Sequence, residues 1–124
     1  MEFEELTHKI IGCAMQVHRT LGNGFQEVIY QRALAIEFEH EGIVFEREKV
    51  MSIFYRDIDI GTRRVDFFVD NKIMVEIKAR TELDDTHLNQ AMNYLEAYQM
   101  KIGLLINFGA NSLQFKRVHN NKIM

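Results

Sequence analysis

Residues 63–78, RRVDFFVDNKIMVEIK, place two apolar runs on either side of a short polar segment. Both runs are rich in Val, Ile and Phe, the residue types that β-strands favour. The polar segment Asp70–Lys72 has the composition of a tight turn. This stretch therefore predicts an antiparallel β-hairpin, and any fold of the chain has to contain it.

Charged side chains interrupt both strands of this predicted hairpin. Asp66 lies within the first strand, and Glu76 and Lys78 lie within the second. Side chains alternate between the two faces of a strand, so Glu76 and Lys78 point to the same face. Because a charge beside a hydrophobic core is destabilising unless it is paired or bound to a metal, these residues need a common explanation.

The length of the turn decides whether Asp66 joins the other two charges. A three-residue loop at 70–72 sets Asp66 opposite Glu76, with Cβ atoms roughly 4.5–5.5 Å apart. A two-residue loop would set Asp66 opposite Val75 and turn Glu76 to the other face. In the first register the two carboxylates repel each other unless a cation lies between them. Mg²⁺ suits such a pair, since it takes one or two carboxylates and keeps several waters.

The spacing also allows a second explanation, in which the hairpin is an edge strand with a polar side facing solvent. Glu76 and Lys78 would then form an ordinary surface pair. If a metal is bound instead, Lys78 lies one pleat away from it, near any anion that the metal holds.

Composition limits the broad class of protein. The chain has 124 residues, 47% of them hydrophobic and 27% charged, which is typical of one globular domain spanning residues 1–124. No apolar run approaches the ~20 residues of a membrane span, and the acidic start, Met1–Glu5, is unlike a signal peptide. The single Cys13 excludes an internal disulfide. We therefore expect a cytoplasmic protein without membrane contact.

The net charge of −3 argues against a surface that wraps long nucleic acid through basic residues alone. The basic residues Arg63, Arg64, Lys78 and Arg80 nevertheless cluster around the hairpin. This pattern predicts a local basic surface around an acidic pocket.

Hydrophobic periodicity predicts one compact α/β domain. Three strands form an antiparallel meander, and a helix and two further strands follow. We expect helices over residues 3–21 and 25–41 and from the cap at 84–86 to about 99, and strands over 45–55, 58–69, 73–79, 102–106 and 113–118. Gly61 marks a candidate break in the second strand, and the tail beyond residue 118 is expected to fray.

Further polar residues lie on the predicted helices. Glu27 falls in the first turn of the second helix, where an acid also stabilises the helix dipole. His18 lies at the edge of the apolar stripe of the first helix. His87, Gln90 and Tyr94 share one face of the third helix, which a solvated polar face would explain equally well.

Residues 17–30, VHRTLGNGFQEVIY, resemble the signature of the GxxExxY proteins, which belong to the PD-(D/E)XK nuclease superfamily. Later segments agree with the same family in the same order: RVD at 64–66, VEIKA at 75–79, the H-x-x-Q-x-x-x-Y-L pattern at 87–95 and KIGLLINFG at 101–109. The resemblance spans residues 7–118, nearly the whole chain. Val65 departs from the pattern, because it stands where the superfamily's name places a proline.

The resemblance implies a restriction-endonuclease-like core, a mixed β-sheet flanked by helices, with one metal-binding corner. Its implied metal ligands are Asp66, Glu76 and Glu27, and its implied metal is Mg²⁺ or Mn²⁺. Its implied catalytic residues are Lys78, Glu76, Asp66 and Gln90. Five further residues match family positions as accessory candidates: His18, Tyr30, Arg64, His87 and Tyr94.

These observations favour a metal-dependent nuclease that hydrolyses phosphodiester bonds in DNA or RNA. In this interpretation Lys78 orients or deprotonates the attacking water, or neutralises the developing charge. One alternative is a non-catalytic module that binds nucleic acid or protein on the same scaffold. Another is a nuclease that acts only as a homodimer or with a partner protein.

Overall fold

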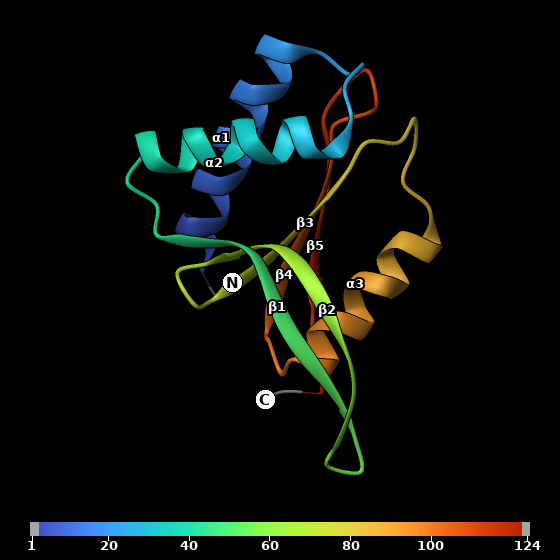
Figure 1. Ribbon diagram of the computed structural model, residues 1–124. Helices are drawn as coiled ribbons and strands as arrows, with labels where there is room; N and C mark the ends of the chain where they lie inside the picture. The colour runs from blue at the N-terminus through green and yellow to red at the C-terminus, as the bar shows by residue number, and fades with distance from the viewer. Residues whose placement is uncertain (1–2, 123–124) are drawn as a thin grey trace.

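The computed structural model describes residues 3–122 and contains a five-stranded sheet between two layers of helices (Figure 1). Helices α1 and α2 cover one face of the sheet and α3 covers the other. The elements are α1 Glu4–Leu21, α2 Glu27–His40, β1 Phe45–Tyr55, β2 Ile58–Val69, β3 Ile73–Lys78, α3 Asp85–Ala97, β4 Ile102–Asn107 and β5 Gln114–His119.

The strand order in the sheet is β1-β2-β3-β4-β5. The first three strands form the predicted antiparallel meander, β4 runs parallel to β3, and β5 is antiparallel to β4. A parallel neighbour needs a crossover of a dozen or more residues, and α3 provides it between β3 and β4. The predicted α/β class with a mixed, helix-flanked sheet is therefore confirmed.

Two apolar cores, one on each face, hold the layers together. The larger core joins α1 and α2 to inward side chains of β2, β3 and β4, and the smaller joins α3 to the opposite face. Strand β4 is buried along its whole length, which explains its uninterrupted apolar sequence. Tyr30 of α2 stacks on Phe108 after β4, with ring centroids 4.7 Å apart.

The hairpin has the predicted three-residue loop. Val69 pairs with Ile73, and the backbone N–H of Lys72 donates to the carbonyl oxygen of Val69 at 2.9 Å. Asp70 and Asn71 have φ values of 51° and 54°, a left-handed conformation that Asp and Asn tolerate better than most residues. The register on which the carboxylate pairing depends is thus confirmed.

Three local predictions are wrong in detail. Strand β2 is not broken at Gly61, although its pairing with β1 shifts register there, between the pairs Ile53–Gly61 and Phe54–Asp59. Helix α3 ends at Ala97, two residues early. The tail does not fray directly after residue 118, because the buried Asn120 donates its backbone N–H to Lys101 at 2.9 Å. Residues 123–124 lie outside the described part of the chain.

Strands β1 and β2 extend together beyond the rest of the sheet as a two-stranded arm, residues 50–64 (Figure 1). This arm carries large apolar side chains that are 57–67% exposed: Val50, Phe54, Tyr55, Ile58 and Ile60. Within residues 3–122, no helix has the length and apolar character needed to cross a membrane.

The end of β3 is tied to the end of β4 by a buried amide. The side chain of Asn107 accepts a hydrogen bond from the backbone N–H of Arg80 at 2.8 Å and donates to the carbonyl of Arg80 at 2.9 Å. Gly109 packs directly on the backbone of Arg80, with no room for a Cβ. These contacts fix the chain that follows Lys78, and hence the end of the strand that carries Glu76.

We predict that Gly109→Ala lowers the free energy of unfolding by about 1–3 kcal/mol, because the new Cβ forces the backbone of Arg80 to move. Gly24→Ala is the matched control, since a Cβ there meets nothing within 4 Å. Urea unfolding of both variants measures the difference. Equal stability of the two variants would show that the junction between β3 and β4 is loose.

Candidate active site

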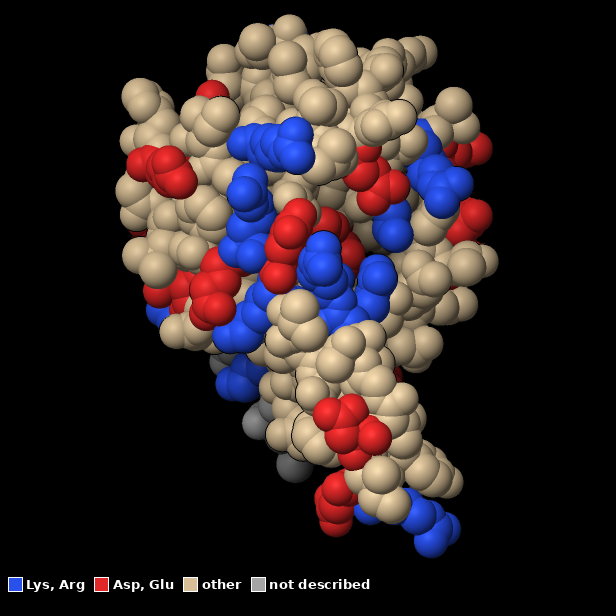
Figure 2. Space-filling model, in the orientation of Figure 1, with Lys and Arg blue, Asp and Glu red and all other residues tan. Residues whose placement is uncertain are grey.

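A cavity of about 300 Å³ contains the charged residues of the hairpin. Its lining comes from α2 and from the first three strands: Glu27, Val28, Gln31, Glu48, Arg63, Arg64, Asp66, Glu76 and Lys78. Figure 2 shows acidic side chains in the middle of this face of the molecule with basic side chains around them. The local basic surface around an acidic pocket, predicted from the sequence, is therefore present.

Asp66 lies where strands β2 and β3 separate. The ladder between these strands ends at the pair Phe67–Val75. Beyond it, Oδ2 of Asp66 accepts the backbone N–H of Ile77 at 2.8 Å, so this carboxylate takes the place of a backbone carbonyl. Oδ1 accepts the side-chain amide of Gln31 at 2.9 Å. Both oxygens of Asp66 are thereby held in fixed positions.

Glu76 is a buried carboxyl group beside Asp66, with only 4% of its surface exposed. Burial, and then the negative charge of Asp66, raise the pKa of Glu76 to about 8. The cations Arg63 and Lys78 act in the opposite direction without cancelling this effect. The Oε1 atom of Glu76 is buried and has no hydrogen-bond partner among residues 3–122.

Cations line the other side of the cavity. Nη2 of Arg63 lies 4.0 Å from Oε2 of Glu76, and its guanidinium stands over the ring of Tyr94 at 4.7 Å. Lys78 is half-buried, and its ammonium group makes no hydrogen bond or ion pair with any residue from 3 to 122. Lys78 is therefore available to a ligand that enters the cavity.

Glu48 enters the cavity from an unusual backbone conformation. It has a φ of 54° inside strand β1, where the left-handed region is strained for any residue other than glycine. Its carboxylate lies 3.7 Å from Nη1 of Arg64. The exposed Arg64 thus contributes charge to the cavity wall while it is paired with an acid.

The structure brings Glu27, Arg64, Asp66, Glu76 and Lys78 to one cavity. Glu27 is exposed at the start of α2 and belongs to the lining of that cavity. The roles predicted for these residues stay predictions. Their placement in one cavity is what a shared site requires.

Other residues named by the resemblance lie outside the cavity lining. His18 is hydrogen bonded through Nε2 to the carbonyl of Ala110 at 3.0 Å, and the hydroxyl of Tyr30 donates to the carbonyl of Gly22 at 2.6 Å. His87 accepts the backbone N–H of Asp84 in the capping box of α3.

Gln90 is exposed on α3 and is not part of the cavity lining. Tyr94 on the same helix reaches the site only through its contact with Arg63. Of the residues on this face of α3, Tyr94 supports Arg63 of the cavity wall, whereas Gln90 lies apart from the cavity.

Besides the apolar Val28, three polar lining residues were not singled out as site residues from the sequence: Gln31, Glu48 and Arg63. The position of Gln31 follows from Glu27, since residues four apart lie on the same face of a helix. Arg63 was recognised only as part of the basic cluster. The sequence contains no signal for the left-handed conformation that turns Glu48 toward the site.

The residues present fit a divalent cation held by a carboxylate pair. Within residues 3–122, no three or more His, Cys, Asp or Glu side chains gather in a group that would hold a metal by themselves. The pair Asp66 and Glu76 offers hard oxygen ligands, and the bare, buried Oε1 of Glu76 needs a partner. Mg²⁺ is commonly bound by one or two carboxylates with waters completing its shell.

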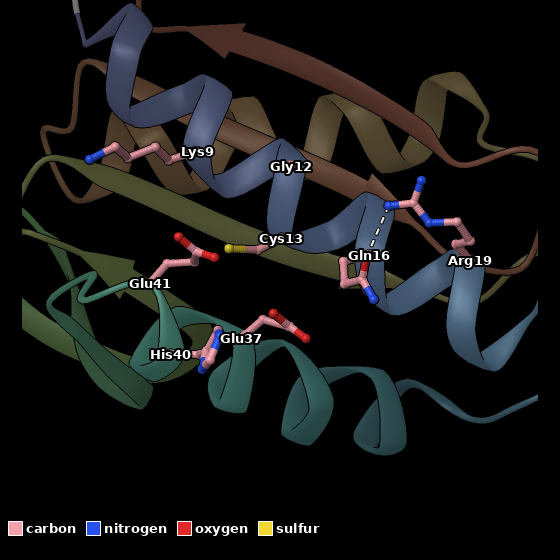
Figure 3. Close-up of a pocket in the computed structure, with 8 residues that line it drawn as sticks. All are labelled: Lys9, Gly12, Cys13, Gln16, Arg19, Glu37, His40 and Glu41. Carbon is pink, nitrogen blue, oxygen red and sulfur yellow. Dashed lines mark hydrogen bonds between the residues drawn. The ribbon is translucent and has the colours of Figure 1, made fainter.

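A larger cavity, of about 500 Å³, lies between α1 and α2 and does not contain this pair (Figure 3). Burial, with the nearby Glu41 and Glu37, raises the pKa of Cys13 in its wall to about 11, so the thiol carries its proton at neutral pH. Figure 3 shows Lys9 and Arg19 at opposite ends of this groove. The groove therefore offers no reactive nucleophile.

We predict that the metal-free protein loses stability as the pH rises from 5 to 8. The pKa of Glu76 is about 8 in the folded protein against an ordinary value of 4.5. The folded state therefore holds a proton that the unfolded state releases, and its contribution is complete below 4.5 and lost as the pH passes 8. In Glu76→Gln this contribution cannot titrate. Urea unfolding in EDTA at several pH values measures the difference, and parallel profiles for the two proteins would contradict it.

Comparisons with known proteins identify a superfamily and a similar fold. The sequence model of the PD-(D/E)XK nuclease superfamily matches residues 4–118. No curated protein matches the chain significantly. A solved structure described as "Crystal structure of SSO0001" superposes on 74% of this chain with a TM-score of 0.60 and 18% sequence identity, which indicates a shared fold. The chain spans only 48% of the length of that protein. Because the superfamily model matches most of its length, the chain belongs to the PD-(D/E)XK nuclease superfamily.

Proposed function

We propose that this chain is a metal-dependent nuclease of the GxxExxY group that hydrolyses phosphodiester bonds in nucleic acid. The observation that carries the proposal is the buried pair of Asp66 and Glu76, with one bare carboxyl oxygen, in a cavity that Lys78 also lines. Superfamily membership supports nuclease chemistry in general. Residues 17–30 support the narrower GxxExxY assignment.

In this proposal Asp66 and Glu76 hold Mg²⁺ or Mn²⁺, and Glu27 contacts the waters of the ion from the cavity wall. When bound, the ion supplies the charge that polarises a phosphate and lowers the pKa of a water. The two hydrogen bonds to Asp66 keep its carboxylate oriented before substrate arrives. Preorganised ligands of this kind need no rearrangement during the reaction.

Lys78 acts on the phosphate or on the attacking water. It is half-buried, and its flexible stem carries a compact charge that can donate to an oxygen in the cavity. Arg63 is held by Tyr94 and faces Glu76, so it adds positive charge near the phosphate. The role that the resemblance assigns to Gln90, orienting a water, stays a prediction.

His18 and Tyr30 act indirectly in this proposal. Tyr30 accepts the backbone N–H of Phe25 at 3.1 Å and donates to Gly22, so it closes the loop between α1 and α2. This loop leads into α2, whose first turn contains Glu27. The two residues thereby place Glu27 without touching substrate, and His87 likewise fixes the start of α3.

Nucleic acid is the expected substrate, and the mixed charge of the site suits it. Basic side chains around the cavity attract a phosphate backbone, while the acids in its centre require a cation to accept one (Figure 2). A non-catalytic binding module would not need a buried carboxyl oxygen without a hydrogen-bond partner. A single nuclease domain at residues 1–124 and a cytoplasmic location are further parts of the proposal.

We predict that Lys78→Ala stays folded and loses nuclease activity by about 10²-fold or more, the usual scale for a positioned acid–base or electrostatic group. Lys78→Arg should not restore full activity, because a guanidinium does not act as a base at neutral pH. Cleavage is measured at saturating Mn²⁺ on a panel of single- and double-stranded DNA and RNA. Lys116→Ala, which removes an exposed lysine of β5, is the control and should cut like the wild type.

Two results would count against this function. If Lys78→Ala cuts as fast as the wild type, the observed activity comes from another site or another protein. If no nucleic acid in the panel is cut with Mg²⁺ or Mn²⁺ but some are bound, the chain is the binding module of the alternative interpretation.

The homodimer expectation has one specific observation in its favour. Strand β1 is an outer strand of the sheet, and its segment 50–55, VMSIFY, carries no charge. An open, uncharged strand edge pairs readily with an antiparallel copy of itself. A second copy bound there would also cover exposed apolar side chains of the arm.

We predict a dimer at tens of micromolar protein, measured by size-exclusion chromatography with light scattering. Phe54→Lys should shift it toward monomer, because a lysine on the strand edge opposes pairing. Ile36→Lys is the control, since Ile36 is 67% exposed and Phe54 is 63% exposed, but Ile36 lies on α2. A monomeric wild type, or equal effects of the two variants, would exclude this dimer.

A further inference from the structure

Gln31 is a buried polar residue of the cavity, and its amide oxygen has no part in the proposed chemistry. Only 6% of its surface is exposed. Its Nε2 donates to Oδ1 of Asp66 at 2.9 Å, while its Oε1 is buried and has no hydrogen-bond partner among residues 3–122. A buried acceptor left without a donor destabilises a protein, so its presence calls for a ligand.

The orientation of this amide follows from its partner. Because the NH₂ group of Gln31 donates to Oδ1 of Asp66, the amide oxygen of Gln31 has to turn away from Asp66. Helix α2 also keeps Gln31 in place, because the neighbouring Tyr30 is fully buried, stacks on Phe108 and donates to Gly22. The bare oxygen is therefore a consequence of how Asp66 is held.

The cavity contains a second buried side-chain oxygen without a hydrogen-bond partner among residues 3–122, Oε1 of Glu76, which a bound cation would contact in its ionised form. Both bare oxygens belong to side chains that interact with Asp66. What satisfies them has to bring positive charge or O–H donors. A phosphate ester brings only acceptor oxygens, whereas a hydrated divalent cation brings both charge and donors.

We propose that Gln31 is a positioning residue of the cation site. Its amide nitrogen orients Asp66 toward the cation, and its amide oxygen accepts a hydrogen bond from a water that the cation carries. This inference rests on the proposed function, since it assumes that Asp66 and Glu76 bind a divalent ion. It gives α2 two residues of the site, Glu27 and Gln31, one turn apart on the same face.

The test is the binding of Mn²⁺ alone to the metal-free protein. Titration calorimetry measures the affinity, and the melting temperature with and without Mn²⁺ is measured at one fixed pH. Gln31→Met removes both polar atoms while keeping the length and helix propensity of the side chain. Gln31→Glu keeps an oxygen acceptor but loses the donor. Asp66→Asn tests the carboxylate pair, and Gln16→Met, at an exposed position of α1, is the matched control.

We expect Gln31→Met to bind Mn²⁺ about 10–100-fold more weakly than the wild type, the usual range for a residue that orients a metal ligand. Gln31→Glu should bind within about threefold of the wild type or more tightly, because its oxygen is retained and its charge attracts the ion. Gln16→Met should match the wild type, and Asp66→Asn should lose binding.

Wild-type affinity in Gln31→Met, or equal weakening in Gln31→Met and Gln31→Glu, would overturn the role of Gln31. If Asp66→Asn still loses binding in that case, the proposed metal site stands. Absence of Mn²⁺ binding in the wild type, or unchanged binding in Asp66→Asn, would overturn both proposals. If circular dichroism shows that Gln31→Met is unfolded, the Gln31→Glu variant is the test. A lower melting temperature without metal and a larger rise in melting temperature with Mn²⁺ than in the wild type support the role of Gln31. A smaller rise than in the wild type refutes it.

Discussion

The hydrogen bond from the backbone N–H of Ile77 to the carboxylate of Asp66 is the interaction on which the site depends. It occurs where the β2–β3 ladder has ended, so the two strands can separate without leaving a buried amide unpaired. Their separation opens the cavity and leaves Glu76 beside Asp66 on the wall. The Asp66 carboxylate replaces a backbone carbonyl of the ladder. The point at which the two strands separate therefore also sets the position of this carboxylate in the site.

This arrangement is destabilising, and other parts of the fold compensate for it. Glu76 is buried near a second carboxyl group, and the 4.0 Å contact with Arg63 is long for an ion pair. The end of β3 keeps its position because it pairs with β4 as far as Lys78, and because Asn107 and Gly109 hold the backbone of Arg80. Apolar cores on both faces of the sheet supply the remaining stability.

The sequence predicted the parts of the site that follow from local periodicity. Strand alternation and loop length limited Asp66 to two registers, because both depend on residues close together in the chain, and the structure has the register that sets Asp66 opposite Glu76. The contact of Gln31 with Asp66 joins residues 35 apart in sequence, and no local pattern encodes it. The left-handed backbone of Glu48 and the end of the ladder at Phe67 also depend on packing between elements.

Superfamily membership leaves open whether the chain cuts nucleic acid or only binds it, and the energetics of Glu76 bear on that choice. Replacing a buried ionisable group by an apolar side chain of similar size often stabilises a protein. Oε1 of Glu76 bonds to nothing in the described residues, so the fold gains no hydrogen bond from it. Asp66 differs, since its carboxylate caps a strand. A module that merely bound nucleic acid would need Asp66 for its fold and would have no need of Glu76.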